Sequence, residues 1–176
     1  DGLIAQGLEA GGHRGIFLTS DMTTQMGTFA LLPQVVAAVR IPVIAAGGIA
    51  DARGVKAALD LGAVAAQVGT AFLLCIEATT RPVHREALKS PQAQHTAITN
   101  VFSGGPARGI VNRVVRELGP LSREAPPFPL ATGAIAPLRT AAEAAGSGDF
   151  SPLWCGQNAS GCHEGSAAEL LERLAP

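Results

Sequence analysis

The sequence predicts an α/β fold built around a parallel sheet. Three short apolar runs, at residues 3–5, 43–46 and 64–68, are rich in small or β-branched side chains, and a glycine soon follows each run. The runs lack polar alternation, which is typical of parallel strands buried on both faces. Helical segments lie between them, and the order strand, glycine turn, helix, strand is that of a βα array.

The segments between the runs have the pattern of amphipathic helices. Residues 31–40 carry apolar side chains at i, i+3, i+4 and i+7, which places them on one helical face. Residues 51–61 begin with Asp51, a residue type that caps helix N-termini, and Gly62 follows as a C-terminal cap. Both helices are therefore expected to alternate with the strands.

The rest of the chain is predicted to be mainly helical and less regular. The predicted elements are helices at residues 81–89, 107–118, 138–145 and 166–174, a turn at 100–106 and an extended, proline-rich loop at 119–137. We expect a single domain over residues 1–176. Its last βα units and ligand-binding loops would occupy residues 1–90, and a helical, Pro/Gly-rich C-terminal extension covering the site would occupy residues 91–176.

Composition excludes several classes of protein. With 13 Lys+Arg against 14 Asp+Glu, the net charge of -1 gives no electrostatic reason to expect nucleic acid or a membrane surface as partner. A hydrophobic content of 47% excludes general disorder. Three cysteines without framework spacing argue against a disulfide scaffold, and neither a signal peptide nor a membrane-spanning run is evident. A cytoplasmic globular protein is the expectation.

Two glycine sites follow consecutive predicted strands. Gly47 and Gly48 follow the strand at 43–46, and Gln67 to Thr70 follow the next strand and include Gly69. Backbone N–H groups at the carboxyl ends of adjacent parallel strands form a nest for a phosphate, as they do in the last two loops of a (β/α)8 barrel. The alternative is that these glycines only allow tight turns.

A histidine surrounded by glycines follows the first predicted strand. His13 comes after Gly11 and Gly12 and shortly before Gly15. The glycines let the backbone approach a flat ligand, and an imidazole titrates near neutral pH, which suits removal of a proton from a weakly acidic carbon. A purely structural histidine is the alternative.

Other chemistry-bearing side chains give weaker signals. Cys155, Cys162 and His163 match no common metal spacing, so no metal site is expected. The remaining candidates are Phe150 and Trp154, which would cover a ligand or simply pack, His84 and His95, which are expected to be solvated, and Arg108, Arg113 and Arg116, which are expected on a solvated helix face.

Taken in order, the motifs resemble the nitronate monooxygenase family. The matching strings are AQGLEAGGHRG (residues 5–15), PVIAAGGIAD (42–51), GAVAAQVGTAFL (62–73), ARGIVNR (107–113) and LWCGQ (153–157). The resemblance covers essentially the whole chain. It implies the C-terminal portion, about strands six to eight, of an FMN-binding (β/α)8 TIM barrel, followed by C-terminal helices and loops.

The resemblance also implies an activity and a set of site residues. The family oxidises alkyl nitronates with O2 to carbonyl compounds and nitrite, and His13 falls on its catalytic base. The residues expected to bind FMN are Gln6, Gly11, Gly12, Gly47, Gly48, Gln67, Val68, Gly69 and Thr70. Because the family has a complete barrel, we expect the chain to be a fragment of a protein about twice as long. The N-terminal half of that barrel would be its missing partner, and a homo-oligomer is possible.

Two other functions stay open from the sequence. An FMN-dependent enoyl-ACP reductase, which uses NAD(P)H, shares the glycine-rich loops and a similar EAGGH string. The second alternative is an inactive fragment that binds flavin or phosphate. The ARGIVNR and LWCGQ segments favour the monooxygenase.

Overall fold

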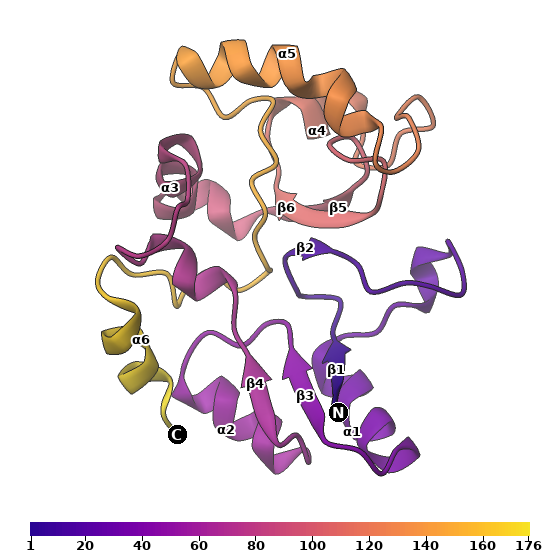
Figure 1. Cartoon of the computed structure of the whole chain (residues 1–176), viewed down its shortest axis with the longest axis vertical. Coiled ribbons are helices and arrows are strands. Elements are labelled where there is room, and N and C mark those ends of the chain that lie inside the picture. Colours follow the sequence, from indigo (N-terminus) through magenta and orange to yellow (C-terminus); the bar gives the residue numbers. More distant parts are fainter. The chain divides into compact units, whose positions relative to one another are not determined.

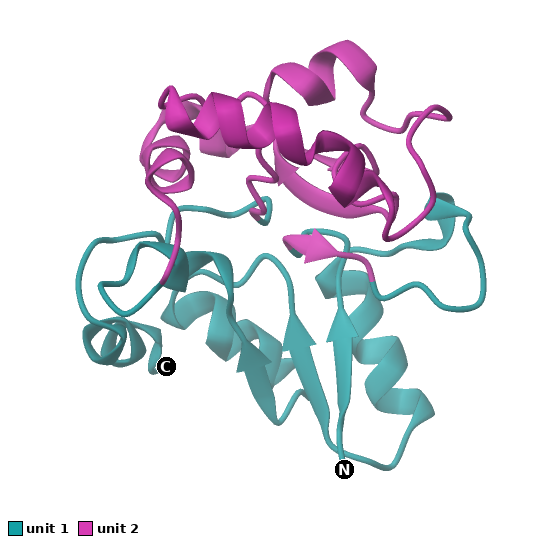
Figure 2. Cartoon of the chain, turned by 45° about the horizontal axis from the view of Figure 1, so that its top comes forward, with its two compact units in different colours: residues 1–10, 15–78, 156–176 teal, residues 11–14, 79–155 magenta.

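A computed structural model describes residues 1–176, which form two compact units (Figure 2). Unit 1 comprises residues 1–10, 15–78 and 156–176, and unit 2 comprises residues 11–14 and 79–155. The expected division at residue 90 stays a prediction. No helix is both long and apolar enough to cross a bilayer.

Unit 1 is built on a three-stranded parallel sheet (Figure 1). Its strands, in the order in which they pair, are β1 (Leu3–Gln6), β3 (Val43–Ala46) and β4 (Ala65–Gln67). Helix α1 (Thr28–Ala38) connects β1 to β3, and α2 (Ala52–Asp60) connects β3 to β4. The predicted alternation of parallel strands and helices is confirmed.

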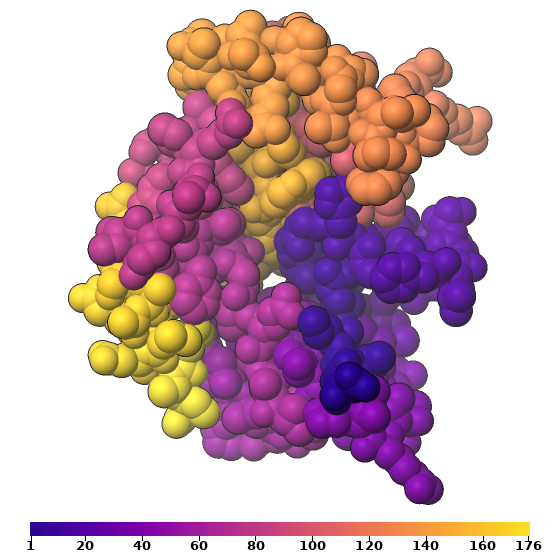
Figure 3. Space-filling model, in the orientation of Figure 1, coloured from indigo at the N-terminus to yellow at the C-terminus, as the bar shows by residue number.

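The two helices pack their apolar sides on one face of this sheet. The core there consists of Ala5, Leu32, Val43, Ala45, Ala58 and Ala63. The alternate residues of the strands point the other way, and Ile4 on edge strand β1 is 52% exposed. Figure 3 shows the start of the chain, in indigo, at the surface of this unit. Burial on both faces, which the apolar runs predicted, is therefore absent in β1. It is also absent in β4, where Ala65 and Gln67 are exposed.

The caps of α2 are those that the sequence predicts. Asp51 accepts a hydrogen bond from the Gly54 N–H at 2.8 Å, and Gly62 follows the helix with a φ of +97°. Such a positive φ favours glycine, so the end of α2 is set locally.

The remaining elements of unit 1 are one further helix and two short 3-10 helices. They are η1 (Met22–Thr24), η2 (Thr70–Leu74) and α6 (Ala167–Leu174). A capping box between Ser166 and Glu169 starts α6, whose Leu170 and Leu174 pack with Ala71 of η2. The C-terminal helix predicted at 166–174 is thus confirmed.

Unit 2 contains an antiparallel sheet with helices around it. The strands pair in the order β2 (Gly12–His13), β6 (Ala107–Ile110) and β5 (Thr96–Thr99). The helices are α3 (Pro82–Lys89), the 3-10 helix η3 (Pro91–Gln94), α4 (Arg113–Leu118) and α5 (Ala131–Ala144). Val101, Phe102, Val111, Val114 and Val115 form the core of this unit.

The prediction of one helix over residues 107–118 was wrong. The helix predicted at 107–118 is a buried strand, β6, followed by a short helix, α4, because pairing with β5 and β2 outweighs local helix propensity. Asn112 separates the two elements by capping α4 at the Val115 N–H. The predicted turn at 100–106 exists but joins two strands.

The proline-rich loop also ends earlier than expected. Helix α5 begins at Ala131, whereas the sequence predicts an extended loop to residue 137 and a helix from 138. Pro137 lies inside the helix, which continues past it. A proline removes one backbone hydrogen bond, and here that loss does not end the helix.

Candidate functional site

The predicted ligand loops of unit 1 lie at one edge of its sheet. In the β1–β3–β4 register, Gln6 and Gln67 both pair with Ala46, one from each side. Gln6 therefore lies level with the start of the loop at Gly47 and Gly48 and with the loop that follows Gln67. The structure brings these predicted site residues together at the carboxyl ends of the strands, where α/β proteins bind ligands.

The glycines of these loops are required for different reasons. Gly47 and Gly48 have φ values of +115° and +74°, which other residues rarely adopt, so the turn itself demands them. Gly69 has a φ of -113°, which any residue adopts, and a Cβ there would meet no atom within 4 Å. The fold therefore does not require glycine at position 69, and open space lies beside this backbone.

Side chains from distant segments hold the loop after β3. The Thr28 hydroxyl lies 2.9 Å from the Gly47 carbonyl oxygen, and the Asn158 side-chain amide donates to the Gly48 carbonyl at 3.0 Å. These contacts turn both carbonyls toward protein donors. Sequence reasoning missed Thr28 and Asn158, because their partners lie far away in the chain.

The loop after β4 is tied to the segment that contains the LWCGQ string. The Thr70 hydroxyl accepts a hydrogen bond from the Gly156 N–H at 2.9 Å, and the Cys162 thiol lies 3.1 Å from the Thr70 carbonyl oxygen. Burial, with a smaller effect of Cys75, raises the pKa of Cys162 to about 11. This thiol therefore stays protonated at neutral pH and is not a nucleophile.

Glu9, the first residue of the EAGGH string, has a structural role. Its carboxylate accepts hydrogen bonds from the Thr28 N–H at 3.0 and 2.8 Å and contacts the Thr28 hydroxyl at 2.8 Å. Thr28 is the first residue of α1, and Gly27 before it supplies no capping side chain. Glu9 thus caps α1 from outside and places a negative charge at its N-terminus. This explains why α1 begins at residue 28, three residues before the predicted start.

The rest of the glycine–histidine motif lies in unit 2. Gly12, with a φ of +74°, and His13 form strand β2, which pairs with Arg108 and Ala107 of β6. Gly11 belongs to the same segment. A Cβ at Gly12 would meet no atom within 4 Å, so this glycine is required by its backbone conformation rather than by crowding.

His13 is an exposed residue whose imidazole is held in place. Its Nε2 lies 2.8 Å from the Ser103 hydroxyl. The ring of Phe128 forms a T-shaped pair with it at 5.6 Å between centroids, and the ring of Trp154 lies at 5.5 Å, tilted by 60°. The two aromatic neighbours and the hydrogen bond with Ser103 restrict the orientation of the imidazole, while the residue remains exposed.

The structure corrects two of the weaker predictions. His84 is half-buried, not solvated, and its Nε2 lies 3.0 Å from the Trp154 carbonyl oxygen. Burial lowers the pKa of His84, partly offset by that contact. Arg108 is a buried residue of β6, not part of a solvated helix face, and donates to the Thr96 hydroxyl at 3.1 Å. Arg113 is exposed, as predicted.

Of the other weak candidates, the aromatic residues Phe150 and Trp154 pack on the core cluster of unit 2. Trp154 also forms an edge-to-face contact with Phe102 at 5.6 Å. His95 and Arg116 are exposed, as predicted.

Comparison with known proteins assigns this architecture to one family. The family model described as nitronate monooxygenase matches residues 1–176. A nitronate monooxygenase of Pseudomonas aeruginosa is 47% identical over 99% of the chain and 50% of the relative. The chain therefore spans about half the length of the curated relatives it matches, and the matched part is their C-terminal half.

Solved structures support the same assignment. A nitroalkane oxidase from Streptomyces ansochromogenes has a TM-score of 0.91 and 44% identity, covering 99% of this chain and 50% of that one. FabK from Thermotoga maritima has a TM-score of 0.77 and 33% identity, covering 99% and 53%. With the parallel βα array, these matches confirm the predicted fold class, the C-terminal part of a TIM barrel.

Proposed function

The chain belongs to the nitronate monooxygenase family, and we propose that it serves the FMN-dependent oxidation of alkyl nitronates by O2 to carbonyl compounds and nitrite. The names of the relatives support the substrate class, because both a nitronate monooxygenase and a nitroalkane oxidase match nearly the whole chain. The observation that carries the proposal within the chain is the oriented imidazole of the exposed residue His13.

His13 is proposed as the base. A neutral nitroalkane has a weakly acidic α-carbon, and an imidazole removes such a proton efficiently when its ring is already oriented. If the substrate arrives as a nitronate, the same side chain binds the anion in its protonated form. Ser103, Phe128 and Trp154 restrict the imidazole, so little ordering is left to occur in the reaction.

FMN is proposed as the cofactor, and the residues of unit 1 fit it. The open space beside Gly69 lies at the carboxyl end of β4, next to η2, and the fold itself does not explain why this residue is glycine. A phosphate that hydrogen-bonds to the backbone of this loop would explain it. When bound, FMN would accept electrons from the nitronate and pass them to O2.

Further contacts to FMN are proposed from the family motifs. Gln6 lies at the end of β1, where its side-chain oxygen accepts the Gly15 N–H at 2.7 Å. The full proposed set is Gln6, Gly11, Gly12, Gly47, Gly48, Gln67, Val68, Gly69 and Thr70. The protein is proposed to act in the cytoplasm on a small nitronate or nitroalkane, without nucleic acid or membrane partners. The near-neutral net charge supports the proposal that nucleic acid and membranes are not its partners.

The test is nitronate-dependent O2 consumption and nitrite release by the purified, flavin-loaded protein. His13→Ala is expected to lower turnover of a neutral nitroalkane at least about a hundredfold, the scale of general base catalysis, while FMN stays bound. His95→Ala is the matched control, because His95 is exposed and lies outside the motif. Unchanged turnover in His13→Ala would remove His13 from the role of base.

The same sample distinguishes the two other functions. Steady NADH oxidation that depends on an enoyl thioester, without nitronate oxidation, would identify a reductase. Saturable FMN binding without turnover of either substrate would identify an inactive flavin-binding module. Either result would refute nitronate oxidation as the function.

A further inference from the structure

A serine far from His13 in the sequence contacts its imidazole. Ser103 lies in the turn at residues 100–106, between β5 and β6, and its hydroxyl oxygen is 2.8 Å from His13 Nε2. Ser103 is buried, with 5% of its surface exposed. The contact joins two residues that are separated by 90 positions.

The Ser103 hydroxyl can serve both protonation states of the ring. It accepts a hydrogen bond from the Gly105 N–H at 3.3 Å and lies 3.2 Å from the Gly105 carbonyl oxygen. When Nε2 has no proton, the hydroxyl donates to it. When Nε2 is protonated, it donates to the Ser103 oxygen, and the hydroxyl proton turns to the Gly105 carbonyl. No heavy atom has to move between the two states.

The turn that carries Ser103 is held by the proline-rich loop. Asn100 donates to the Ser122 carbonyl at 2.8 Å and accepts from the Ser122 N–H at 2.9 Å. Gly104 has a φ of +87°, and a Cβ there would collide with the backbone at Pro126. The same loop carries Phe128, whose ring forms a T-shaped pair with His13. Ser103 and Phe128 therefore belong to two segments that are hydrogen-bonded to each other.

We propose that Ser103 is the positioning residue of His13, and that it holds the imidazole in one orientation through both protonation states of the catalytic cycle. The role in catalysis rests on the proposed function of His13 as base. The contact itself does not, because it concerns only groups of this chain. A hydrogen bond with a purely structural role would also explain the 2.8 Å distance between Ser103 and His13. It would not require the Gly105 carbonyl oxygen as a second acceptor for the Ser103 hydroxyl.

The test combines kinetics with a spectroscopic measurement that needs no substrate. Ser103→Ala is expected to lower kcat about tenfold or more, with little change in KM, since orientation rather than binding is lost. In protein labelled with ¹⁵N-histidine, the Nε2 signal of His13 is expected to shift in Ser103→Ala. Only four histidines are present, so assignment with His→Gln variants is direct.

Two further variants separate positioning from a structural effect. Ser103→Thr keeps the hydroxyl and is expected to restore the Nε2 signal and most of kcat. Ser147→Ala removes another serine hydroxyl of unit 2, which accepts the Asp149 N–H, and is expected to change neither. Circular dichroism of each variant reports whether it folds.

The outcomes distinguish this proposal from the proposed function. An unchanged His13 signal and unchanged kcat in folded Ser103→Ala would overturn the positioning role while nitronate oxidation stands. A changed signal in Ser103→Ala, in a protein that oxidises no nitronate, would keep the Ser103–His13 contact and refute the activity.

Discussion

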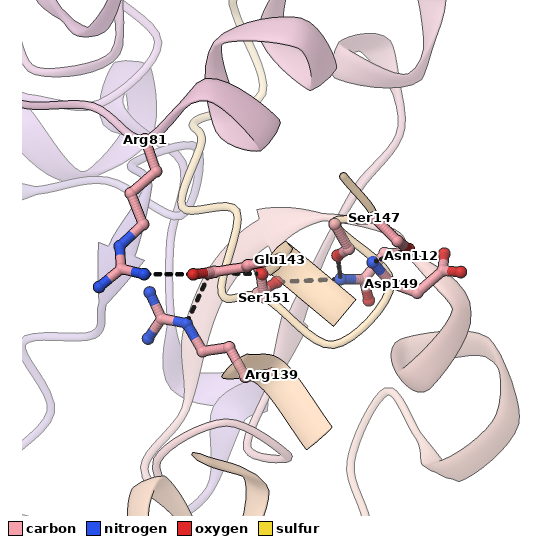
Figure 4. Close-up of polar contacts among 8 residues, drawn as sticks. Arg81, Asn112, Arg139, Glu143, Ser147, Asp149 and Ser151 are labelled. Carbon is pink, nitrogen blue, oxygen red and sulfur yellow. Dashed lines mark hydrogen bonds and ion pairs between the residues drawn. The ribbon is translucent and has the colours of Figure 1, made fainter. Parts of the chain in front are cut away.

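Replacement of Glu143 by alanine is expected to destabilise unit 2 more than loss of any exposed ion pair. Glu143 lies near the end of α5, and its side chain is 11% exposed. Figure 4 shows its carboxylate between Arg81, Arg139 and Ser151. Arg139 and Ser151 donate to it at 2.8 and 2.7 Å, and Arg81 forms a further ion pair. One carboxylate thus connects α5 with the N-terminal end of α3 and the loop that contains Ser151.

The magnitude follows from these contacts. A hydrogen bond to a charged group contributes about 1.5–3 kcal/mol, and an exposed ion pair about 0–1 kcal/mol. The Arg81 side chain is 62% exposed, so in Glu143→Ala water replaces the carboxylate and this ion pair contributes little to the loss. Ser151 is buried, and its hydroxyl would lose the hydrogen bond to Glu143. Together these give an expected loss of about 2–4 kcal/mol for Glu143→Ala.

Urea unfolding at neutral pH measures this loss. Glu117→Ala is the control, because the Glu117–Arg113 ion pair is about half exposed on both sides and should be worth about 0–1 kcal/mol. A destabilisation of Glu143→Ala no larger than that of Glu117→Ala would refute the reasoning.

The same carboxylate predicts a dependence on pH. Burial raises the pKa of Glu143, but the hydrogen bonds from Arg139 and Ser151 and the positive charge of Arg139 outweigh it, so the pKa is lowered from 4.5. Because the folded-state pKa is the lower one, the stabilisation is complete above the unfolded-state value and is lost as the pH falls through the folded-state value. The difference between wild type and Glu143→Gln should therefore shrink in that acidic range. A difference that stays constant there would show that the charge of Glu143 contributes nothing.

Two further substitutions test unit 1. Gly69→Ala is expected to leave urea stability within about 0.5 kcal/mol of wild type, because its φ suits alanine and the site is open, but to weaken FMN binding about tenfold or more in a fluorescence titration. Equal FMN affinity would mean that this glycine serves no ligand. Glu9→Ala is expected to cost about 1–2 kcal/mol in urea unfolding through loss of the α1 cap, with Glu9→Gln costing less since it keeps an acceptor for the Thr28 N–H. Equal stability of Glu9→Ala and wild type would exclude the capping role.

The elements that the sequence predicts well are those whose signals are local. Strands β3 and β4 fall within the apolar runs at residues 43–46 and 64–68, each followed by a glycine, and α2 is bounded by Asp51 and Gly62. Each of these signals acts within a few residues: a carboxylate caps the turn that follows it, and a glycine adopts a positive φ. The groups that determine these elements therefore lie close together in the sequence.

The elements that were predicted wrongly depend on partners that are distant in sequence. Residues 107–110 form a strand because β5 and β2 pair with them on either side. Arg108, which the sequence predicts on a solvated helix face, is buried in this strand. Helix α1 starts at Thr28 because Glu9 caps it from 19 residues away. No local pattern contains that information.

The candidate site also combines features that are local in sequence with contacts between distant residues. The glycines after the parallel strands and the glycine-flanked histidine are evident from the sequence alone, because both are patterns of adjacent residues. The contacts of each residue are evident only from the folded structure. It showed that Gly47 and Gly48 are required by their φ values and Gly69 is not, that Glu9 is a helix cap, and that Ser103 contacts His13. The physical reason is that capping, close approach and hydrogen bonding depend on distance in space, which folding sets independently of separation along the chain.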